Sequence, residues 1–198
     1  MGYKHHPQIA GVDEVGRGAL FGPVVAAAVM LSPVAANQLV KAGVKDSKQL
    51  RTSEREILYE IIKSQAIAFQ IGMASVREID RINILQASLL AMRRAIQRLS
   101  IQPELCLVDG NRPIPNFFIP QRTIIKGDQT EPAIAAASIL AKVWRDRLMV
   151  RLDQRYPGYH LASNKGYGSR AHLQGLQALG PSVQHRLSFA PCQIGLPL

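Results

Sequence analysis

The sequence of 198 residues has little cysteine, no long apolar run and few acidic residues. Its two cysteines, Cys106 and Cys192, lie far apart and fit no paired metal or redox spacing. We interpret them as reduced thiols, with Cys106 in the core. Reduced thiols suit a cytoplasmic protein.

Segments that would enter a membrane are also lacking. The longest apolar segment, VVAAAVML, is far shorter than the ~20 residues that a membrane-spanning helix needs. The first residues, MGYKHHPQ, lack the apolar region of a secretory signal peptide. We therefore expect no membrane association and a cytoplasmic location.

The charge balance is strongly basic. Fourteen Asp and Glu stand against 24 Lys and Arg, a formal net charge of +10. This balance favours a polyanionic partner, most often nucleic acid, although a merely solvated basic surface has the same composition. With 47% hydrophobic residues, the chain is long enough for one domain with a substantial core.

Apolar patterns predict a mixed α/β sheet. Strands followed by alternating strands and helices are typical of this class. One predicted helix, TSEREILYEIIKSQ, has Thr52 as its expected N-cap. The predicted strands are residues 8–14, 23–31 and 66–75, the runs 104–110 and 122–128 each end in an acid beside glycine, and the predicted helices are 52–65, 78–99, 131–156 and 169–179.

Four acids, Asp13, Glu14, Asp109 and Asp128, share one context, since each closes an apolar run. Carboxylates gathered at strand ends repel one another until a proton or a cation neutralises them. Oxygen ligands suit Mg²⁺ or Mn²⁺, and two such ions ~3.5–4 Å apart can clamp a phosphodiester. A single acid at a strand end is commonly a turn residue, but four in so basic a chain favour a metal-dependent nuclease.

The adjacent acids Asp13 and Glu14 raise a geometric difficulty. Neighbouring residues of a regular strand point to opposite faces of the sheet. Both can face one site if the strand ends or bulges there. We expect such a break because Gly16 and Gly18 follow at once.

Seven segments, in order, resemble ribonuclease HII, the type 2 ribonuclease H family. The match runs from Ile9 to about Pro191, and a lone VDG would carry no weight without the others. The segments are DEVGRG (13–18), KDSKQL (45–50), VDGN (108–111), KGD (126–128), IAAASILAKVWRDRLM (134–149), SNKGYGSRAH (163–172) and HRLSFAP (185–191).

The resemblance implies a ribonuclease H-like fold. It implies a mixed sheet of five strands flanked by helices, followed by a small helical C-terminal segment. We expect one domain, in which residues 1–156 form the catalytic core and residues 157–198 complete the substrate site. We also expect a monomer.

The resemblance further implies the reaction and its ligands. It assigns Asp13, Glu14, Asp109 and Asp128 to a site for Mg²⁺ or Mn²⁺. The implied reaction is hydrolysis of the RNA strand of an RNA–DNA hybrid, or of a DNA strand at an embedded ribonucleotide. Cleavage 5′ to the ribonucleotide would leave a 3′-hydroxyl and a 5′-phosphate.

The turn Gly16-Arg17-Gly18 is implied to read the ribose 2′-hydroxyl, the group that distinguishes RNA from DNA. Glycines suit this role because they let backbone approach the sugar closely. Tyr167 is implied to stack on the deoxyribose that follows the ribonucleotide. Two lysines, Lys48 and Lys165, are candidate phosphate contacts, or else exposed surface lysines, and Arg17 has an alternative in pairing with a site acid.

Some positions depart from the family pattern. Ala19 stands where proline is common and Phe21 where a small residue is common, but neither change removes a carboxylate. Glu131 is interpreted as favouring a helix N-terminus. Three histidines in or near matched segments are interpreted as packed or hydrogen-bonded rather than as metal ligands: His160, His172 and His185.

Two other functions fit the sequence less well. A binding module without activity would gain nothing from four repelling carboxylates in a phosphate site. Another metal nuclease of the same fold, such as a junction resolvase, has no reason for GRG and NKGYG. The last residues, QIGLPL, resemble peptides that dock on a bacterial sliding clamp, so we expect either a clamp contact through Gln193–Leu198 or an apolar tail.

Overall fold

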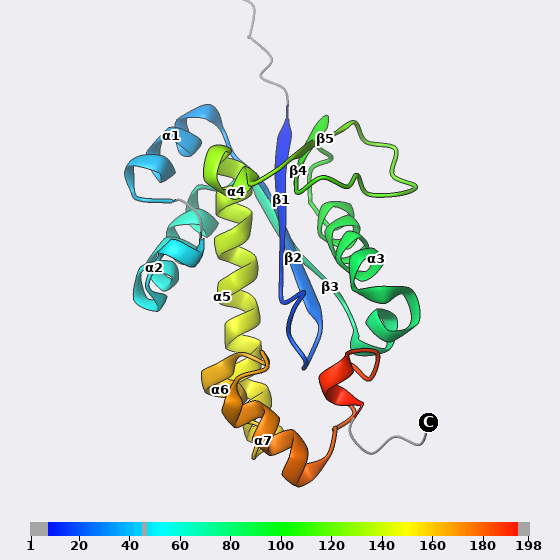
Figure 1. Cartoon of the computed structure of the whole chain (residues 1–198). Coiled ribbons are helices and arrows are strands. Elements are labelled where there is room, and N and C mark those ends of the chain that lie inside the picture. The colour runs from blue at the N-terminus through cyan, green and yellow to red at the C-terminus, as the bar shows by residue number, and fades with distance from the viewer. Residues whose placement is uncertain (1–7, 45–46, 194–198) are drawn as a thin grey trace, which may run out of the picture.

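A five-stranded mixed sheet runs through the centre of the computed structural model, which describes residues 8–44 and 47–193 (Figure 1). The strand order is β3-β2-β1-β4-β5. The first three strands are antiparallel neighbours, and β4 and β5 run parallel to β1. The strands are β1 (Ile9–Val15), β2 (Val24–Met30), β3 (Ala68–Ala74), β4 (Leu105–Asp109) and β5 (Gln121–Ile124).

Helices cover both faces of this sheet. One face packs on α3, and the other packs on α5 with α1 and α2 beside it, while α6 and α7 lie at the far end of α5 (Figure 1). The expected mixed sheet with flanking helices is confirmed. The helices are α1 (Pro33–Lys41), α2 (Thr52–Gln65), α3 (Val76–Gln97), α4 (Gly127–Thr130), α5 (Pro132–Arg155), α6 (Leu161–Asn164) and α7 (Arg170–Leu179), with 3₁₀ turns at Ser47–Gln49 and Ala190–Cys192.

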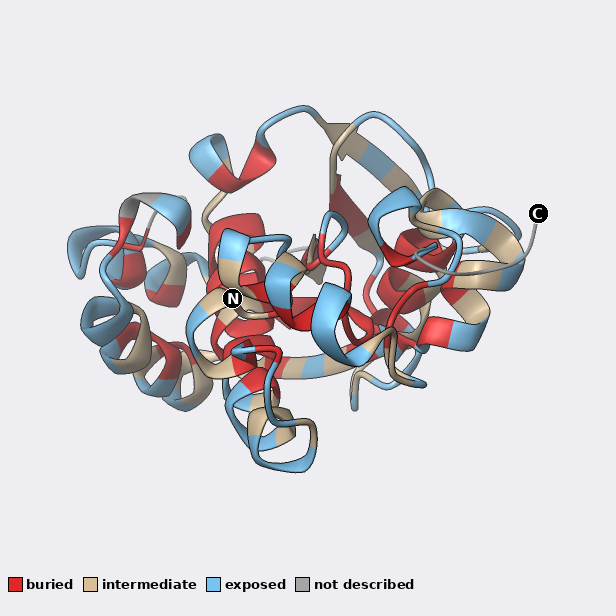
Figure 2. Ribbon diagram, turned by 60° about the horizontal axis from the view of Figure 1, so that its bottom comes forward, coloured by how far each residue is buried: buried red, intermediate tan, exposed pale blue. Residues whose placement is uncertain are grey.

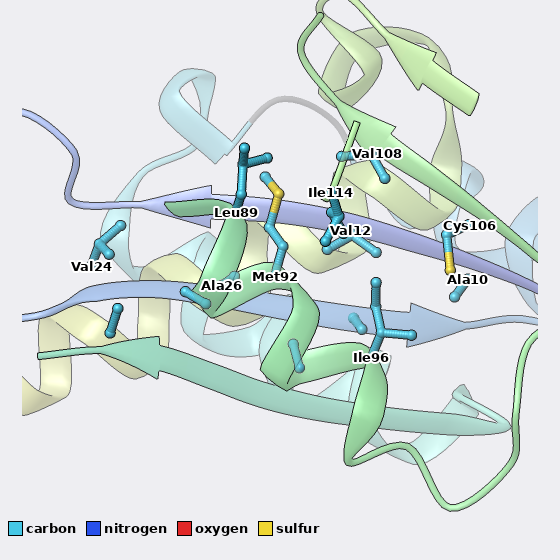
Figure 3. Packing of buried hydrophobic residues seen from close by; sticks show 14 of the residues in the cluster. Ala10, Val12, Val24, Ala26, Leu89, Met92, Ile96, Cys106, Val108 and Ile114 are labelled. Carbon is cyan, nitrogen blue, oxygen red and sulfur yellow. The ribbon is translucent and has the colours of Figure 1, made fainter. Parts of the chain in front are cut away.

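Strand β2 is buried along its whole length because both of its faces are covered. Its residues alternate between the two cores, so Ala26 packs toward α3 and Ala27 toward α5. Figure 3 shows the α3 side, where Val12 and Ala26 of the strands gather with Leu89 and Met92 of the helix. Figure 2 shows the outcome, with buried residues on the inward sides of helices and exposed residues outside.

Helix α5 approaches β1 so closely that Gly11 is required. A Cβ built at Gly11 would lie 2.2 Å from the carbonyl carbon of Ala133. The Ala-rich sequence of α5 allows the same approach from the helix side. This contact fixes the start of α5 against the strand that carries Asp13 and Glu14.

A third apolar cluster joins the C-terminal segment to the rest of the domain and consists of Leu20, Phe21, Met149, Tyr159, Leu161, Leu176 and Cys192. Phe21 is its centre: the Phe21 ring lies 5.3 Å from the Tyr156 ring and 4.9 Å from the His185 ring, both edge to face. Its side chain is fully buried. Phe21, which departs from the family pattern, is thus a core residue. Ala19, the other departure, is fully buried as well.

Two local expectations are corrected. Helix α2 begins at Thr52, but its N-cap is Arg51, whose N–H donates to the Glu54 carboxylate at 2.6 Å. Helix α3 begins earlier than expected, after Ser75, whose hydroxyl accepts from the Glu78 N–H. Within the described ranges, no helix has the length and apolar character needed to cross a membrane.

Candidate active site

The two adjacent acids lie within regular β1 rather than at a break in it. The pairing of β1 with β2 continues without a bulge through Asp13, Glu14 and Val15, so the expected break is wrong. Asp13 lies opposite Ala27 and Glu14 opposite Ala26 of β2, and the chain turns only at Gly16. Asp13 is buried on the α5 side, whereas Glu14 lines a pocket on the α3 side.

Asp109 and Asp128 reach the same end of the sheet from different elements. Asp109 is the last residue of β4, and its Oδ1 accepts from the Gly127 N–H at 2.7 Å. Asp128 does not close a strand, because β5 ends at Ile124 and the chain turns at Lys126, whose φ is +57°. Asp128 therefore lies in the first turn of α4, adjoining the glycine that Asp109 holds.

The carboxylates act on one another electrostatically. Burial raises the pKa of Asp13 well above its usual range, and the charges of Glu14 and Asp109 raise it further. Burial also raises the pKa of Glu14, with Arg17 opposing and Asp109 reinforcing the effect. The end of β1 and β4 is thus a place where negative charge is crowded and a cation would be stabilised.

The donor chemistry of this end fits a hard divalent cation. The carboxylates supply only oxygen, and their mutual repulsion is what such an ion relieves. Side-chain cations already stand at the edges: Arg17 Nη1 lies 3.2 Å from Glu14 Oε1, and Lys48 Nζ lies 3.6 Å from Asp128 Oδ2. In the described residues, no three acidic, histidine or cysteine side chains form a ready-made metal cluster.

The turn after β1 contains two glycines with different surroundings. Gly16 has φ +88°, and a Cβ there would lie 2.2 Å from Arg145 Nε. Gly18 has no positive φ, and a Cβ there would meet no atom within 4 Å. Packing and backbone geometry therefore explain Gly16, whereas Gly18 is open to an approaching ligand.

The loop that carries Tyr167 lies beside this turn. The carbonyl of Gly166 accepts from the Leu20 N–H at 2.8 Å. Tyr167 is partly exposed, and its ring lies 5.6 Å from the Arg145 guanidinium carbon. The ammonium of Lys165 donates to the carbonyl of Ala162 within the same loop. Two segments far apart in the sequence thus form one surface.

Two buried arginines, neither of which was expected from the sequence, hold these segments. Arg186 donates to the carbonyls of Gly16 and Arg17, each at 2.7 Å, and to that of Gly22 at 3.0 Å. Arg145 donates to three carbonyls: those of Pro23 at 3.2 Å, Lys165 at 2.8 Å and Phe21 at 3.0 Å. Their only signal in the sequence was membership of two matched segments.

Two of the three histidines of the C-terminal segment, His172 and His185, are packed as expected, whereas His160 is exposed and the expectation is wrong for it. The Nε2 atoms of His172 and His185 lie 3.1 Å apart, and both side chains are buried. His172 Nδ1 contacts the carbonyl of Tyr167 at 2.9 Å. This pair therefore holds the Tyr167 loop through the carbonyl of Tyr167.

The strand order and the acids at the ends of β1 and β4 define a protein of the ribonuclease H-like fold. A family model described as ribonuclease HII matches residues 10–192. The ribonuclease HII of Acaryochloris marina is 70% identical over 189 residues, covering 96% of each chain. This chain belongs to the ribonuclease HII family and is a type 2 ribonuclease H, an endoribonuclease of RNA–DNA hybrids.

Two solved structures share the fold. The ribonuclease H2 of Pyrococcus horikoshii OT3 is 26% identical, with a TM-score of 0.80, and the alignment covers 94% of this chain and 95% of that one. The RNase HII of Archaeoglobus fulgidus, solved in complex with PCNA, is 29% identical, with a TM-score of 0.66 and coverage of 86% and 85%.

Proposed function

We propose that this enzyme incises duplex DNA on the 5′ side of an embedded ribonucleotide, leaving a 3′-hydroxyl and a 5′-phosphate, besides cutting RNA–DNA hybrids. The observation that carries the proposal is the open position of Gly18 beside crowded carboxylates. A glycine with no packing or backbone reason of its own lets a sugar approach the main chain. A ribose 2′-hydroxyl is the group such backbone would distinguish.

Asp13, Glu14, Asp109 and Asp128 would hold Mg²⁺ or Mn²⁺. The ions, when bound, supply an activated water and stabilise the leaving oxygen. The chain's own part is to fix the ligands: Gly127 N–H holds Asp109, and Arg17 offsets the charge of Glu14. His172 and His185 are occupied with each other and would not serve as a general base.

Substrate contacts would flank these carboxylates. The turn Gly16-Arg17-Gly18 would read the ribose, and the Tyr167 ring would stack on the deoxyribose that follows. Lys48, whose side chain is 81% exposed, would contact a backbone phosphate. Lys165 would do the same after its ammonium leaves the carbonyl of Ala162.

The wider assignments complete the proposal. The enzyme would act as a cytoplasmic monomer, with residues 157–198 completing the substrate site of a core formed by residues 1–156. A sliding-clamp contact would use Gln193–Leu198, of which 194–198 lie outside the described residues. The complex of Archaeoglobus fulgidus RNase HII with PCNA supports this idea.

A cleavage assay tests the proposal. A labelled DNA duplex with one ribonucleotide is incubated with Mg²⁺, Mn²⁺ or chelator, beside an all-DNA duplex. We expect metal-dependent incision 5′ to the ribonucleotide only. Asp109→Asn keeps an acceptor for the Gly127 N–H but removes a charge, and should slow incision at least about a hundredfold. Tight binding without incision under either metal would contradict the proposal.

A further inference from the structure

The Arg145 guanidinium lies between the two parts of the surface that the proposed function assigns to substrate reading. On one side it packs against Gly16, where a Cβ would lie 2.2 Å from its Nε. On the other side it lies under the Tyr167 ring and donates to the carbonyl of Lys165. One planar group therefore contacts both the turn and the tyrosine loop.

Arg186 fixes the turn from its inner side. Its Nη atoms bind the carbonyls of Gly16 and Arg17, so both carbonyls point into the protein. The next two residues are held from α3, because the Asp80 carboxylate accepts from the N–H groups of Leu187 and Ser188 at 3.2 and 3.0 Å. The turn is thus held by the guanidinium of Arg186, and the backbone that follows Arg186 is itself fixed by hydrogen bonds to Asp80.

Neither arginine is explained by an ion pair. Both side chains are fully buried, and within the described residues neither forms an ion pair, although the charge of Asp146 acts on Arg145 and that of Asp80 on Arg186 from farther away. Burying a guanidinium without a carboxylate is unfavourable, so carbonyl oxygens must stabilise it. The pKa of Arg186 is lowered to about 9 by burial and by Arg145, which leaves it charged at neutral pH.

We infer that Arg145, with Arg186 bracing the turn, is a positioning residue that sets the spacing between the ribose-reading turn and Tyr167. The inference rests on the proposed function. It makes the preference for an RNA-to-DNA junction depend on a buried guanidinium that touches no substrate. A duplex with one ribonucleotide can bind productively only when the turn and Tyr167 are correctly spaced. A long hybrid offers a ribose at every position and therefore depends less on this spacing.

The test is an internal competition between a single-ribonucleotide duplex and a uniform RNA–DNA hybrid carrying different fluorophores. Both substrates compete for the same folded enzyme, so the ratio of their kcat/KM values is unaffected by any unfolded fraction. Arg145→Lys keeps the charge but loses the planar fork. We expect it to lower the preference for the single-ribonucleotide duplex about tenfold or more.

Two further variants make the result decisive. Arg186→Lys releases the turn while leaving Arg145 in place, and should lower the ratio as well. It also decides the matter if Arg145→Lys does not fold. On a Tyr167→Ala background, Arg145→Lys should change the ratio little, because the junction reader is already gone. Arg94→Lys is the matched control, since Arg94 binds the carbonyl of Met73 and the Glu78 carboxylate away from the site.

The outcomes separate the two proposals. If the wild-type enzyme shows no preference for the junction, the proposed reading by Tyr167 fails. If the wild type shows the preference and the folded arginine variants retain it, the positioning role is overturned. A lowered ratio in the arginine variants, with Arg94→Lys unchanged, supports the role.

Discussion

At the scale of single residues, the two glycines of the Gly16-Arg17-Gly18 turn are glycine for different reasons. Gly16 is required by the protein, because its φ is positive and Arg145 fills the space a side chain would need. Gly18 is required by nothing within the described residues. A shared motif thus contains one position that shapes the turn and one that leaves it open.

Alanine at each glycine should separate these causes. Gly16→Ala should lower the free energy of unfolding by about 1–3 kcal/mol, because a strained φ and a clash with Arg145 coincide. Gly18→Ala should change stability by less than about 0.5 kcal/mol yet slow incision at least about tenfold. Urea unfolding and the single-ribonucleotide assay measure the two effects. Wild-type incision by Gly18→Ala would show that no sugar approaches there.

The two candidate lysines differ in their contacts. The exposed side chain of Lys48 pairs with the candidate site acid Asp128, whereas Lys165 donates to a carbonyl of its own loop. Lys48→Ala should reduce the slope of log affinity against log salt by about 1, and Lys165→Ala by less. Fluorescence anisotropy with the ribonucleotide duplex, on the Asp109→Asn background, measures both slopes. An unchanged slope for Lys48→Ala would show that Lys48 contacts no phosphate and only pairs with Asp128.

At the scale of elements, the histidine pair joins α7 to the loop after it in a single protonation state. The Ser182 N–H donates to His185 Nδ1, so His185 carries its proton on Nε2 and donates to His172. His172 then donates from Nδ1 to the carbonyl of Tyr167. A proton added to either ring would place two N–H groups against each other.

This pair should make stability depend on pH in the acid range. Burial and the neighbouring His172 lower the pKa of His185 to about 4 in the folded state, against about 6.5 when unfolded. The unfolded chain therefore takes up the proton first. The contribution of His185 to stability should be complete above pH ~6.5 and fall by up to about 3 kcal/mol as pH decreases toward 4. The raised pKa values of Asp13 and Glu14 act in the opposite direction, so the difference between the wild type and His185→Gln isolates the contribution of His185.

Urea unfolding at several pH values tests this expectation. His185→Gln should remove this contribution between pH ~4.5 and ~6.5. Glu78 does not contribute to the change in stability between pH ~4.5 and ~6.5. Hydrogen bonds from Arg94 lower the pKa of Glu78 to about 2, so its contribution to stability is lost only at lower pH. Equal slopes for wild type and His185→Gln would contradict the assignment.

The elements that could be predicted are those whose signals are local. β2 was predictable because a strand buried on both faces is a continuous apolar run. Asp128 was misplaced because an apolar run before an acid does not show where the ladder stops. The turn at Lys126, in a left-handed conformation that lysine rarely adopts, leaves no mark in composition.

At the scale of the whole molecule, the candidate acids and glycines were predictable and their supports were not. Asp13, Gly16 and Gly18 lie within one contiguous motif. Arg186 binds the carbonyl of Gly16, 170 residues away in the sequence. The sequence alone does not distinguish a buried arginine from an exposed one. Only the packed structure shows that its guanidinium faces inward, so the candidate substrate-reading residues could be named from the sequence, whereas the arginines that hold them could not.

Deleting Gln193–Leu198 tests the partner assignment for the intact enzyme. Since the third apolar cluster ends at Cys192, cleavage and stability should be nearly unchanged, whereas binding to a bacterial sliding clamp should be lost. Calorimetric titration of the clamp with full-length and shortened enzyme measures the difference. The same affinity for both would remove the clamp from the proposal.

The contact between Arg186 and the turn after β1 has a consequence for synthesis on the ribosome. The strand bearing Asp13 and the turn beside it leave the ribosome before Asp109 and Asp128, and all of them leave before Arg186, which holds the turn. Under the proposed function, a growing chain therefore carries its four acids before it can distinguish ribose from deoxyribose, and selectivity waits for Arg186 to emerge.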